Sequence, residues 1–407
     1  MRTKLLIILL TVIYSINNET VAQVGIGTIT PDPSSILDMN STTQGMLAPR
    51  MLSSERIAIA NPAQGLLVFD TEQDAFYYYK GGNWVKLEGA VKRDNYKLVK
   101  STADLADELA AGGGTSYKLN STFLYEINGT IIIDHPIELN EAYIRGQDTR
   151  GDILFNNTGS ALFTGFKGGN IRDLLISGNG KPAFDISSSA TQSLVINSVV
   201  FVGCNSVGSL SDLGLVFFNI SQFINCSGGL TVSNITSYLM SNIFWRDSST
   251  DTFLTLVGTF DDIQLSSGRI AVDNGEVGID VSSNPTVNNT ASINGVAFTG
   301  NGTRVNGYTA GGYPSYLFTK YWDVSTPGLK SETDNSATGD IFLSTRIGSG
   351  FVTAFNGTGI GSRTKINGLS ASNHLFRFVR SGDNRIVYDG VKPRNFQITT
   401  SLSFQGD

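Results

Sequence analysis

Three consecutive segments decide the fold of this chain. They share one pattern of strand-forming residues: VINSVVFVGC (195–204), FFNISQFINC (217–226) and LMSNIFWRD (239–247). Phe201, Phe223 and Trp245 hold the same position in the three segments and lie 22 residues apart. A fixed interval of this size, with strand chemistry and no helical periodicity, indicates the stacked coils of a β-solenoid.

A second series of positions repeats at the same interval. Val195, Phe217 and Leu239 also lie 22 residues apart. Leucine-rich repeats have a similar period, but the L-x-x-L-x-L-x-x-N pattern is missing from these segments. We therefore predict an all-β protein with a right-handed parallel β-helix over residues 96–306.

The spacing changes on both sides of the three segments. Ile176 lies 25 residues before Phe201. Leu265 lies 20 residues after Trp245. Phe298 follows 33 residues after Leu265, which predicts a longer loop in that coil.

A short helix is expected at the start of the β-helix. Ser101 can cap a helix over residues 101–111, with Asp104 three residues further on, and the glycines at 112–114 end it. Short apolar strands follow between residues 117 and 144. This order resembles the entry to pectate-lyase-like β-helices, where a helix covers the exposed end of the first coil.

Residues 24–89 form a separate N-terminal module. Its last part, GLLVFDTEQDAFYYYKGGNWVKL (65–87), predicts a meander of three strands with a tight Gly-Gly turn. The segments VGIGT (24–28), GLLVFDT (65–71) and YYKGGNW (78–84) resemble the N-terminal module of secreted proteins of Bacteroidetes and of phage-like tail fibres. That resemblance implies a role in attachment or assembly.

Residues 307–407 carry a different pattern of short strands and turns, as in LFRFVRSG (375–382) and NRIVYDG (384–390). They resemble the jelly-roll end domains that close trimeric tail fibres. A complete jelly roll has about eight strands, whereas this pattern predicts five or six, so the domain is either small or truncated. The resemblance to fibres implies a homotrimer.

The first 23 residues are typical of a signal peptide. Arg2 and Lys4 precede the apolar run Leu5–Tyr14, which is too short to span a membrane. We therefore expect a protein that is secreted or held at the cell surface, with no membrane insertion.

The composition argues against several classes of function. The chain has 407 residues, a formal net charge of −6 and no basic block, whereas nucleic-acid binding needs a positive footprint. The two Cys cannot complete a four-ligand zinc set, and only His135 and His374 accompany them. No nucleic acid, metal or cofactor is expected.

The two cysteines, Cys204 and Cys226, belong to the 22-residue repeat. This spacing predicts that they lie on adjacent coils, where strands are about 4.8 Å apart. A disulfide and a pair of stacked buried thiols both fit such an arrangement.

Many β-helix proteins cleave polysaccharides, and the pair Asp261 and Asp262 is the one weak candidate for such chemistry. Polygalacturonase-like enzymes combine paired carboxylates with Gly-His-Gly and Arg-x-Lys motifs. This chain has no Gly-His-Gly, and the Arg269-Ile270-Ala271 segment that follows the pair lacks the Lys. Adjacent residues of a strand also point to opposite faces, which predicts that one member of the pair lies at a turn.

The aromatic residues Tyr313, Tyr316, Tyr321 and Trp322 are the candidates for a carbohydrate contact. The alternative is that they pack at the junction with the end domain or between subunits. We interpret the chain as a structural and adhesive fibre-like protein that binds a surface glycan or polysaccharide. A polysaccharide-degrading lyase or glycoside hydrolase, and a bare glycan-binding module, remain the alternatives.

Overall fold

The computed structural model describes residues 23–88, 93–246, 251–343, 351–354, 357, 359–366, 368–382 and 384–402. The chain divides into two compact units, Met1–Lys92 and Arg93–Asp407. Except for Gln23, the predicted signal peptide lies outside the described residues. Among the residues that are described, no helix is long and apolar enough to cross a membrane.

The first unit contains a two-stranded parallel sheet and a four-stranded sheet. Its elements are β1 (Val24–Ile26), β2 (Leu37–Met39), β3 (Arg50–Met51), α2 (Ser53–Ala58), β4 (Leu67–Asp70), β5 (Ala75–Lys80) and β6 (Asn83–Lys86). Strands β4, β5 and β6 pair antiparallel in sequence order, which confirms the predicted meander. Arg56 of α2 lies 3.8 Å above the Tyr77 ring and pairs with the buried Asp70 carboxylate at 2.9 Å, so a charge pair holds the helix on the sheet.

The second unit begins with the predicted capping helix. Strand β7 (Tyr96–Val99) leads into a 3-10 turn, η1 (Thr102–Leu105), and then into α3 (Ala106–Ala111). The backbone N–H of Ser101 donates to the Asp104 carboxylate at 2.9 Å, as the capping pattern predicts. Glu108 of α3 is buried and accepts hydrogen bonds from Lys97 at 2.8 Å and from the Tyr125 hydroxyl at 2.7 Å. The helix is therefore fixed over the first coil by polar contacts.

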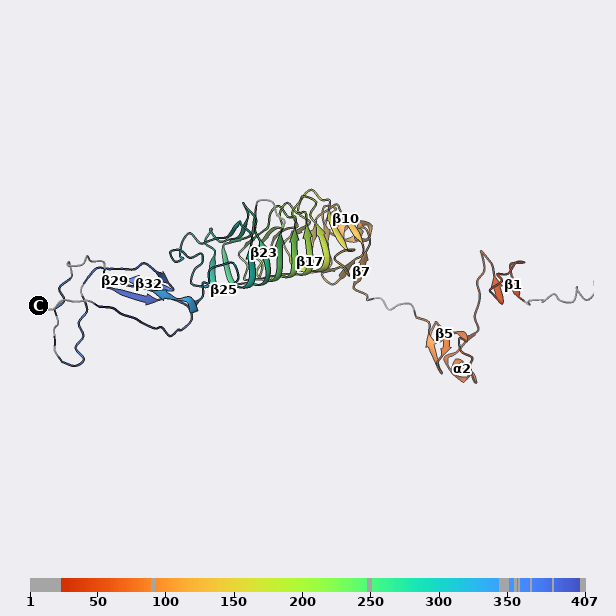
Figure 1. The fold of residues 1–407 in the computed structure, drawn as a ribbon. Helices are drawn as coiled ribbons and strands as arrows, with labels where there is room; N and C mark the ends of the chain where they lie inside the picture. The colour runs from red at the N-terminus through yellow and green to blue at the C-terminus, as the bar shows by residue number, and fades with distance from the viewer. Residues whose placement is uncertain are drawn as a thin grey trace, which may run out of the picture. The chain divides into compact units, whose positions relative to one another are not determined.

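Two parallel sheets form the walls of the solenoid (Figure 1). The 12-stranded sheet contains β7, β9 (Leu124–Ile127), β10 (Thr130–Ile133), β12 (Tyr143–Arg145), β13 (Ile153–Asn156), β15 (Gly169–Ser177), β17 (Ser193–Val202), β19 (Leu215–Ile224), β21 (Ser237–Arg246), β23 (Thr259–Ala271), β25 (Thr286–Thr299) and β27 (Trp322–Ser325). The nine-stranded sheet contains β8 (Tyr117–Lys118), β11 (Ile137–Glu138), β14 (Phe163–Gly165), β16 (Phe184–Ser187), β18 (Gly208–Ser211), β20 (Leu230–Ser233), β22 (Thr252–Val257), β24 (Val277–Asp280) and β26 (Thr303–Asn306). From β15 onward the chain alternates between the two sheets, so each coil stacks on the one before it.

The register of the coils confirms the 22-residue repeat. Phe201 lies opposite Phe223, and Phe223 lies opposite Trp245. The expectation that Leu265 continues this column is wrong, because the next coil is longer and brings Ile270 opposite Trp245. Phe298 then pairs with Ile270, so it belongs to the same column.

Large aromatic side chains fill the centre of the solenoid. The rings of Phe201 and Phe223 stack with centroids 5.0 Å apart and planes 9° apart. Trp245 lies 6.2 Å from Phe223, and Phe253 lies 4.8 Å from Trp245. All four side chains are fully buried, and each such burial contributes about 1.5–3 kcal/mol relative to exposure.

At one equivalent position, each long strand of the 12-stranded sheet has a residue in a left-handed backbone conformation. These residues occupy equivalent positions and have φ between 49° and 69°: Asp173, Ser198, Ile220, Asn242, Ser267 and Gly295. They interrupt the alternation of side chains, so that Asn197 and Ser198 both lie outside the core. We call this column the corner, because it separates the two flanks of the sheet.

Ile220 is the unfavourable member of the corner. A left-handed conformation costs an L-residue about 1–2 kcal/mol, and for a β-branched residue it is an outlier. Ile220 has φ 49°, and its side chain is 49% exposed. Beside it the Asn219 side-chain amide donates to the Asn197 side-chain oxygen at 3.3 Å, so the two asparagines stack on adjacent coils.

The solenoid continues beyond residue 306, the boundary that the sequence suggests, because β27 pairs in parallel with β25. After β27 come η2 (Asp334–Ser336), β28 (Thr338–Gly339), β29 (Phe342–Leu343), β30 (Ser370–Ala371), β31 (Leu375–Phe376), β32 (Phe378–Ser381) and β33 (Arg385–Tyr388). The end region is built from antiparallel strands. In its described part these strands form three separate two-stranded sheets, whereas the sequence suggests a jelly roll.

Candidate functional site

The aromatic stretch predicted to contact carbohydrate lies where the last coil meets the end region. Trp322 of β27 is 1% exposed, and its ring lies 4.6 Å from that of Phe318. Its indole N–H donates to the Tyr308 hydroxyl at 3.0 Å, and this hydroxyl donates to the Pro285 carbonyl at 2.7 Å. Burial raises the pKa of Tyr308 to about 12. Trp322 therefore closes the end of the core and offers no surface to a ligand.

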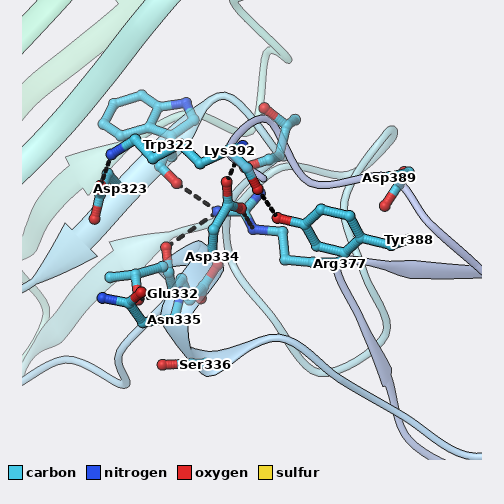
Figure 2. A network of polar contacts seen from close by, with 12 residues as sticks. Trp322, Asp323, Glu332, Asp334, Asn335, Ser336, Arg377, Tyr388, Asp389 and Lys392 are labelled. Atoms are coloured by element: carbon cyan, nitrogen blue, oxygen red, sulfur yellow. Dashed lines mark hydrogen bonds and ion pairs between the residues drawn. The ribbon is translucent and has the colours of Figure 1, made fainter. Parts of the chain in front are cut away.

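Arg377 forms the centre of a buried polar network beside Trp322 (Figure 2). Its guanidinium donates to the carbonyl oxygens of Thr319 at 3.0 Å, Trp322 at 2.5 Å and Glu332 at 3.1 Å. It also forms an ion pair with Asp334, with 3.1 Å between nitrogen and oxygen. One charged side chain thus connects the end region to the last coil.

The two carboxylates of this network also accept backbone N–H groups. The N–H of Lys392 donates to Asp334 at 2.7 Å. Those of Leu317 and Phe318 donate to Glu332 at 2.8 and 3.0 Å. Burial raises the pKa of Glu332. The network holds three chain segments together, which is the arrangement of a structural anchor.

Tyr313 and Tyr316 pack within the same junction. The Tyr316 ring stacks on Phe376 with centroids 4.0 Å apart and planes 12° apart. The Tyr313 hydroxyl donates to the Asp389 carboxylate at 2.8 Å, and burial, followed by this carboxylate, raises the pKa of Tyr313. Both rings therefore serve the contact between the last coil and the end region.

Tyr321 is the candidate that remains accessible, with 39% of its surface exposed. It lines a cleft of about 560 Å³ between the last coils and the end region. Lys320 and Arg380 also line the cleft, and the Lys320 ammonium lies 5.7 Å from the Tyr321 ring. An exposed ring beside two cations suits the apolar face of a sugar and a nearby acidic group.

Asp261 and Asp262 lie at an irregular point of β23. The pairing of β23 with β25 shifts register between Phe260 and Asp262. The N–H groups of both aspartates donate to the Thr236 carbonyl at 3.0 Å, and Asp261 accepts a hydrogen bond from the Asn288 amide at 2.7 Å. The irregularity is a bulge within the strand, so the expectation that one aspartate lies at a turn is wrong.

Cys204 and Cys226 lie on adjacent coils, as the repeat predicts. Both are free, and both are buried at 1% and 0% exposure. The Cys226 thiol lies 3.8 Å from the Phe201 carbonyl oxygen. A hydrogen bond between the two thiols, followed by burial, raises the pKa of the Cys204 thiol. This is the environment of unreactive core cysteines.

We expect thiol counting to find two free thiols per chain. In the folded protein neither thiol should react with a maleimide, because both are buried and the Cys204 thiolate is disfavoured. Both should react after unfolding without a reductant. If unfolding releases no thiol until a reductant is added, the two residues form a disulfide instead.

In the described part of the chain, no group of three His, Cys, Asp or Glu side chains could hold a metal ion. His135 contacts the Asp134 carboxylate at 3.1 Å, and its ring lies 5.7 Å from that of Tyr117. Both contacts hold the His135 ring in the turn between β10 and β11.

The first unit leaves many apolar side chains in contact with solvent. In the described part of this unit, eleven large apolar residues are more than 40% exposed: Val24, Ile26, Ile29, Ile36, Leu37, Met39, Met46, Leu47, Leu52, Ile57 and Leu87.

Residues 25–103 match the family model of the phage tail like trimerisation region. The trimerisation region thus includes the described part of the first unit from residue 25 onward. It also includes β7 and the start of the capping turn in the second unit.

No curated protein matches the chain. A solved structure, ORF18 of Geobacillus virus E2, is similar to it at 13% sequence identity. The similarity covers 70% of this chain and 75% of that chain, with a TM-score of 0.24.

Sequence reasoning missed the charged members of the site. Glu332, Asp334 and Arg377 lie in segments without a repeat, so no spacing connects them. A usable signal is the position of Arg377 between Phe376 and Phe378, where a charge interrupts an apolar strand. The cations that line the cleft, Lys320 and Arg380, have no comparable signal.

Proposed function

We propose that this protein is a homotrimeric, fibre-like structural protein with an adhesive role. The trimerisation region at residues 25–103 is the observation that carries the proposal. The solenoid that follows it in the sequence is a rigid rod-forming fold, because every coil hydrogen-bonds to its neighbours along the whole stack.

The exposed apolar residues of the first unit support three copies meeting there. Association that covers Ile29, Ile36 and Leu47, which are 99%, 82% and 71% exposed, gains about 25 cal/mol for each Å² of apolar surface removed from water. In a single chain these apolar side chains stay in contact with water. The second copy and the third copy are the simplest partners, since each presents the same surface.

Light scattering on the full secreted chain tests the proposal. We expect three chains per particle. Replacing Ile36 and Leu47 with Lys should shift the particle toward single chains, whereas Thr231→Lys, on a polar face of the solenoid, should leave the mass unchanged. A wild-type particle containing one chain would refute the proposed assembly.

We further propose that the chain is exported, as in the secreted Bacteroidetes and tail-fibre proteins that its N-terminal module resembles. The short apolar run behind Arg2 and Lys4 supports this. N-terminal sequencing of the secreted protein should start near residue 24, and a start at Met1 would contradict export by this route.

The adhesive part of the proposal rests on the cleft beside Tyr321. Its size suits one or two sugar residues. Its two cations, Lys320 and Arg380, outnumber its one carboxylate, Asp389, and so favour a glycan with carboxylate groups. We expect Tyr321→Ala to weaken retention on such a glycan by about tenfold, the loss of roughly 1.4 kcal/mol of ring contact.

Affinity electrophoresis through uronic-acid polysaccharides and neutral polysaccharides measures this retention. Phe166→Ala is a matched control, because Phe166 is 81% exposed and does not line the cleft. Equal retention of the Tyr321 and Phe166 variants on every polysaccharide would remove the cleft from the proposal.

A further inference from the structure

The nine-stranded sheet of the solenoid presents an ordinary solvent-facing surface. Ile186, Leu210 and Val232 point into the core. Most of the residues that alternate with them on β16, β18, β20 and β22 are small and polar: Asp185, Ser187, Ser209, Ser211, Thr231, Ser233 and Thr255. Val257 of β22 is the apolar exception. This is the alternation expected of a sheet with one face in water.

The 12-stranded sheet departs from this rule. Apolar side chains also occupy its outward positions, on both flanks of the corner. The first apolar face, before the corner, consists of Tyr96, Leu124, Tyr143, Val195, Leu215, Phe217 and Leu239. The second apolar face, after the corner, consists of Ile132, Ile153, Phe155, Leu175, Val200, Val202, Ile224 and Phe244.

Register aligns the members of each face in columns that polar residues interrupt. Asn170 lies between Tyr143 and Val195 on the first face. On the second face Ser177 lies between Phe155 and Val202, and Gln222 lies between Val200 and Phe244. On the first face Val195, Phe217 and Leu239 are direct neighbours on successive strands. On the second face Leu175 neighbours Val200, and Val202 neighbours Ile224. Apolar columns of this length on an outer surface mark a contact with another protein.

The last members of both faces, Leu239 and Phe244, lie on β21, where Arg246 already follows Ile224 in the other column of the second face. At β23, Gln264 follows Leu239 on the first face, and Arg269 follows Phe244 on the second. This common end point along the solenoid is expected if the same neighbouring chains cover both faces.

We infer that the solenoids of three copies pack side by side, with the first apolar face of each copy against the second apolar face of the next. This inference rests on the proposed trimer. A ring of three identical chains needs two different patches on each chain, because its interface is heterologous. Two apolar faces that flank one corner satisfy this requirement, with the three corners directed toward the symmetry axis.

The corner itself fits this arrangement. Ile220 is an exposed, β-branched residue held in a left-handed conformation between the two faces. Near a three-fold axis its side chain would meet the same residue of two other copies. The fold sets the left-handed conformation at every corner position, and such a contact would explain why an exposed β-branched residue occupies this one.

A second copy is the partner that the trimerisation region favours. Its match extends to residue 103 and so includes β7. Tyr96 of β7 pairs in register with Leu124, and so it is the first member of the first apolar face. Three copies that meet through residues 25–103 thus bring this face together from its first strand.

Oxidative cross-linking of the full chain tests the inference. The variant carries Val195→Cys and Val200→Cys, which lie on opposite flanks of one coil, and we expect oxidation to give covalent trimers in denaturing electrophoresis. The matched control carries Ser187→Cys and Thr231→Cys on the polar face and should remain single chains. The native cysteines are buried and should not contribute.

The outcomes separate the inference from the proposed function. A particle of three chains without cross-links at Val195 and Val200 would overturn the side-by-side packing and leave the trimer standing. A particle of one chain would overturn both. Carbene footprinting of the unmodified protein gives a second measurement: Ile220 should lose its label in the particle while Val391, 54% exposed, keeps it. Equal labelling of the two residues would refute the packing.

Discussion

Phe223→Asp is expected to lower the stability of the solenoid by about 5 kcal/mol, the largest effect of any single change considered for this protein. Phe223 is fully buried and contacts the rings of Phe201, Trp245 and Phe253, at centroid distances of 5.0, 6.2 and 5.4 Å. Replacing it removes these contacts, opens a cavity and buries a carboxylate among aromatic rings. Thermal unfolding followed by circular dichroism measures the loss.

Two controls isolate the effect of the core position. Thr231→Asp introduces the same charge on the polar outer face, and Asp262→Asn changes a carboxylate at the bulge of β23. Both should keep the melting temperature of the parent within a few degrees, because surface substitutions usually change stability by about 0.5 kcal/mol or less. If Phe223→Asp melts together with these controls, the aromatic column is not the core.

Arg377→Met is expected to release the end region from the solenoid. The Arg377 side chain is 1% exposed and donates to three carbonyl oxygens while it pairs with Asp334. Met fills a similar volume but leaves the Asp334 carboxylate buried without its cation. Breaking a buried pair in this way costs about 3–5 kcal/mol.

Hydrogen exchange locates that loss along the chain. The amides of residues 332–343 and 375–389 should exchange much faster in the variant, whereas those of β17 and β19 should keep their protection. Arg385→Met is the matched control, because Arg385 is exposed and its guanidinium bonds to the Ser381 hydroxyl at 3.1 Å. Unchanged exchange in the end region of the Arg377 variant would show that the network is not an anchor.

The aromatic column and the capping helix could be predicted because each follows from a local rule. A constant interval relates Phe201 to Phe223 and Trp245, and a capping pattern sets the start of the helix at Ser101. The interval failed at Leu265, because coil length is free to vary wherever a loop is inserted. Ile270 takes that position, and nothing in its own sequence context marks it.

The outward direction of the series that contains Val195 could not be predicted. The series that contains Phe201 and the series that contains Val195 are both apolar and share one interval, yet the first points inward and the second outward. Sequence alternation alone does not say which of two apolar sets forms the core. The contact of Arg377 with Asp334 could not be predicted either, because it depends on how segments without a repeat pack against the last coil.

The unequal lengths of the strands decide where this solenoid would fail under mechanical load. Its hydrogen bonds between coils run along the axis, so tension along the axis is shared by all the bonds between two coils. Strands β17, β19 and β21 each have ten residues, whereas β7 and β27 have four. Rupture should therefore begin at the two ends and leave the central coils intact. At the far end, the hydrogen bond from Arg377 to the Trp322 carbonyl ties the end region to β27.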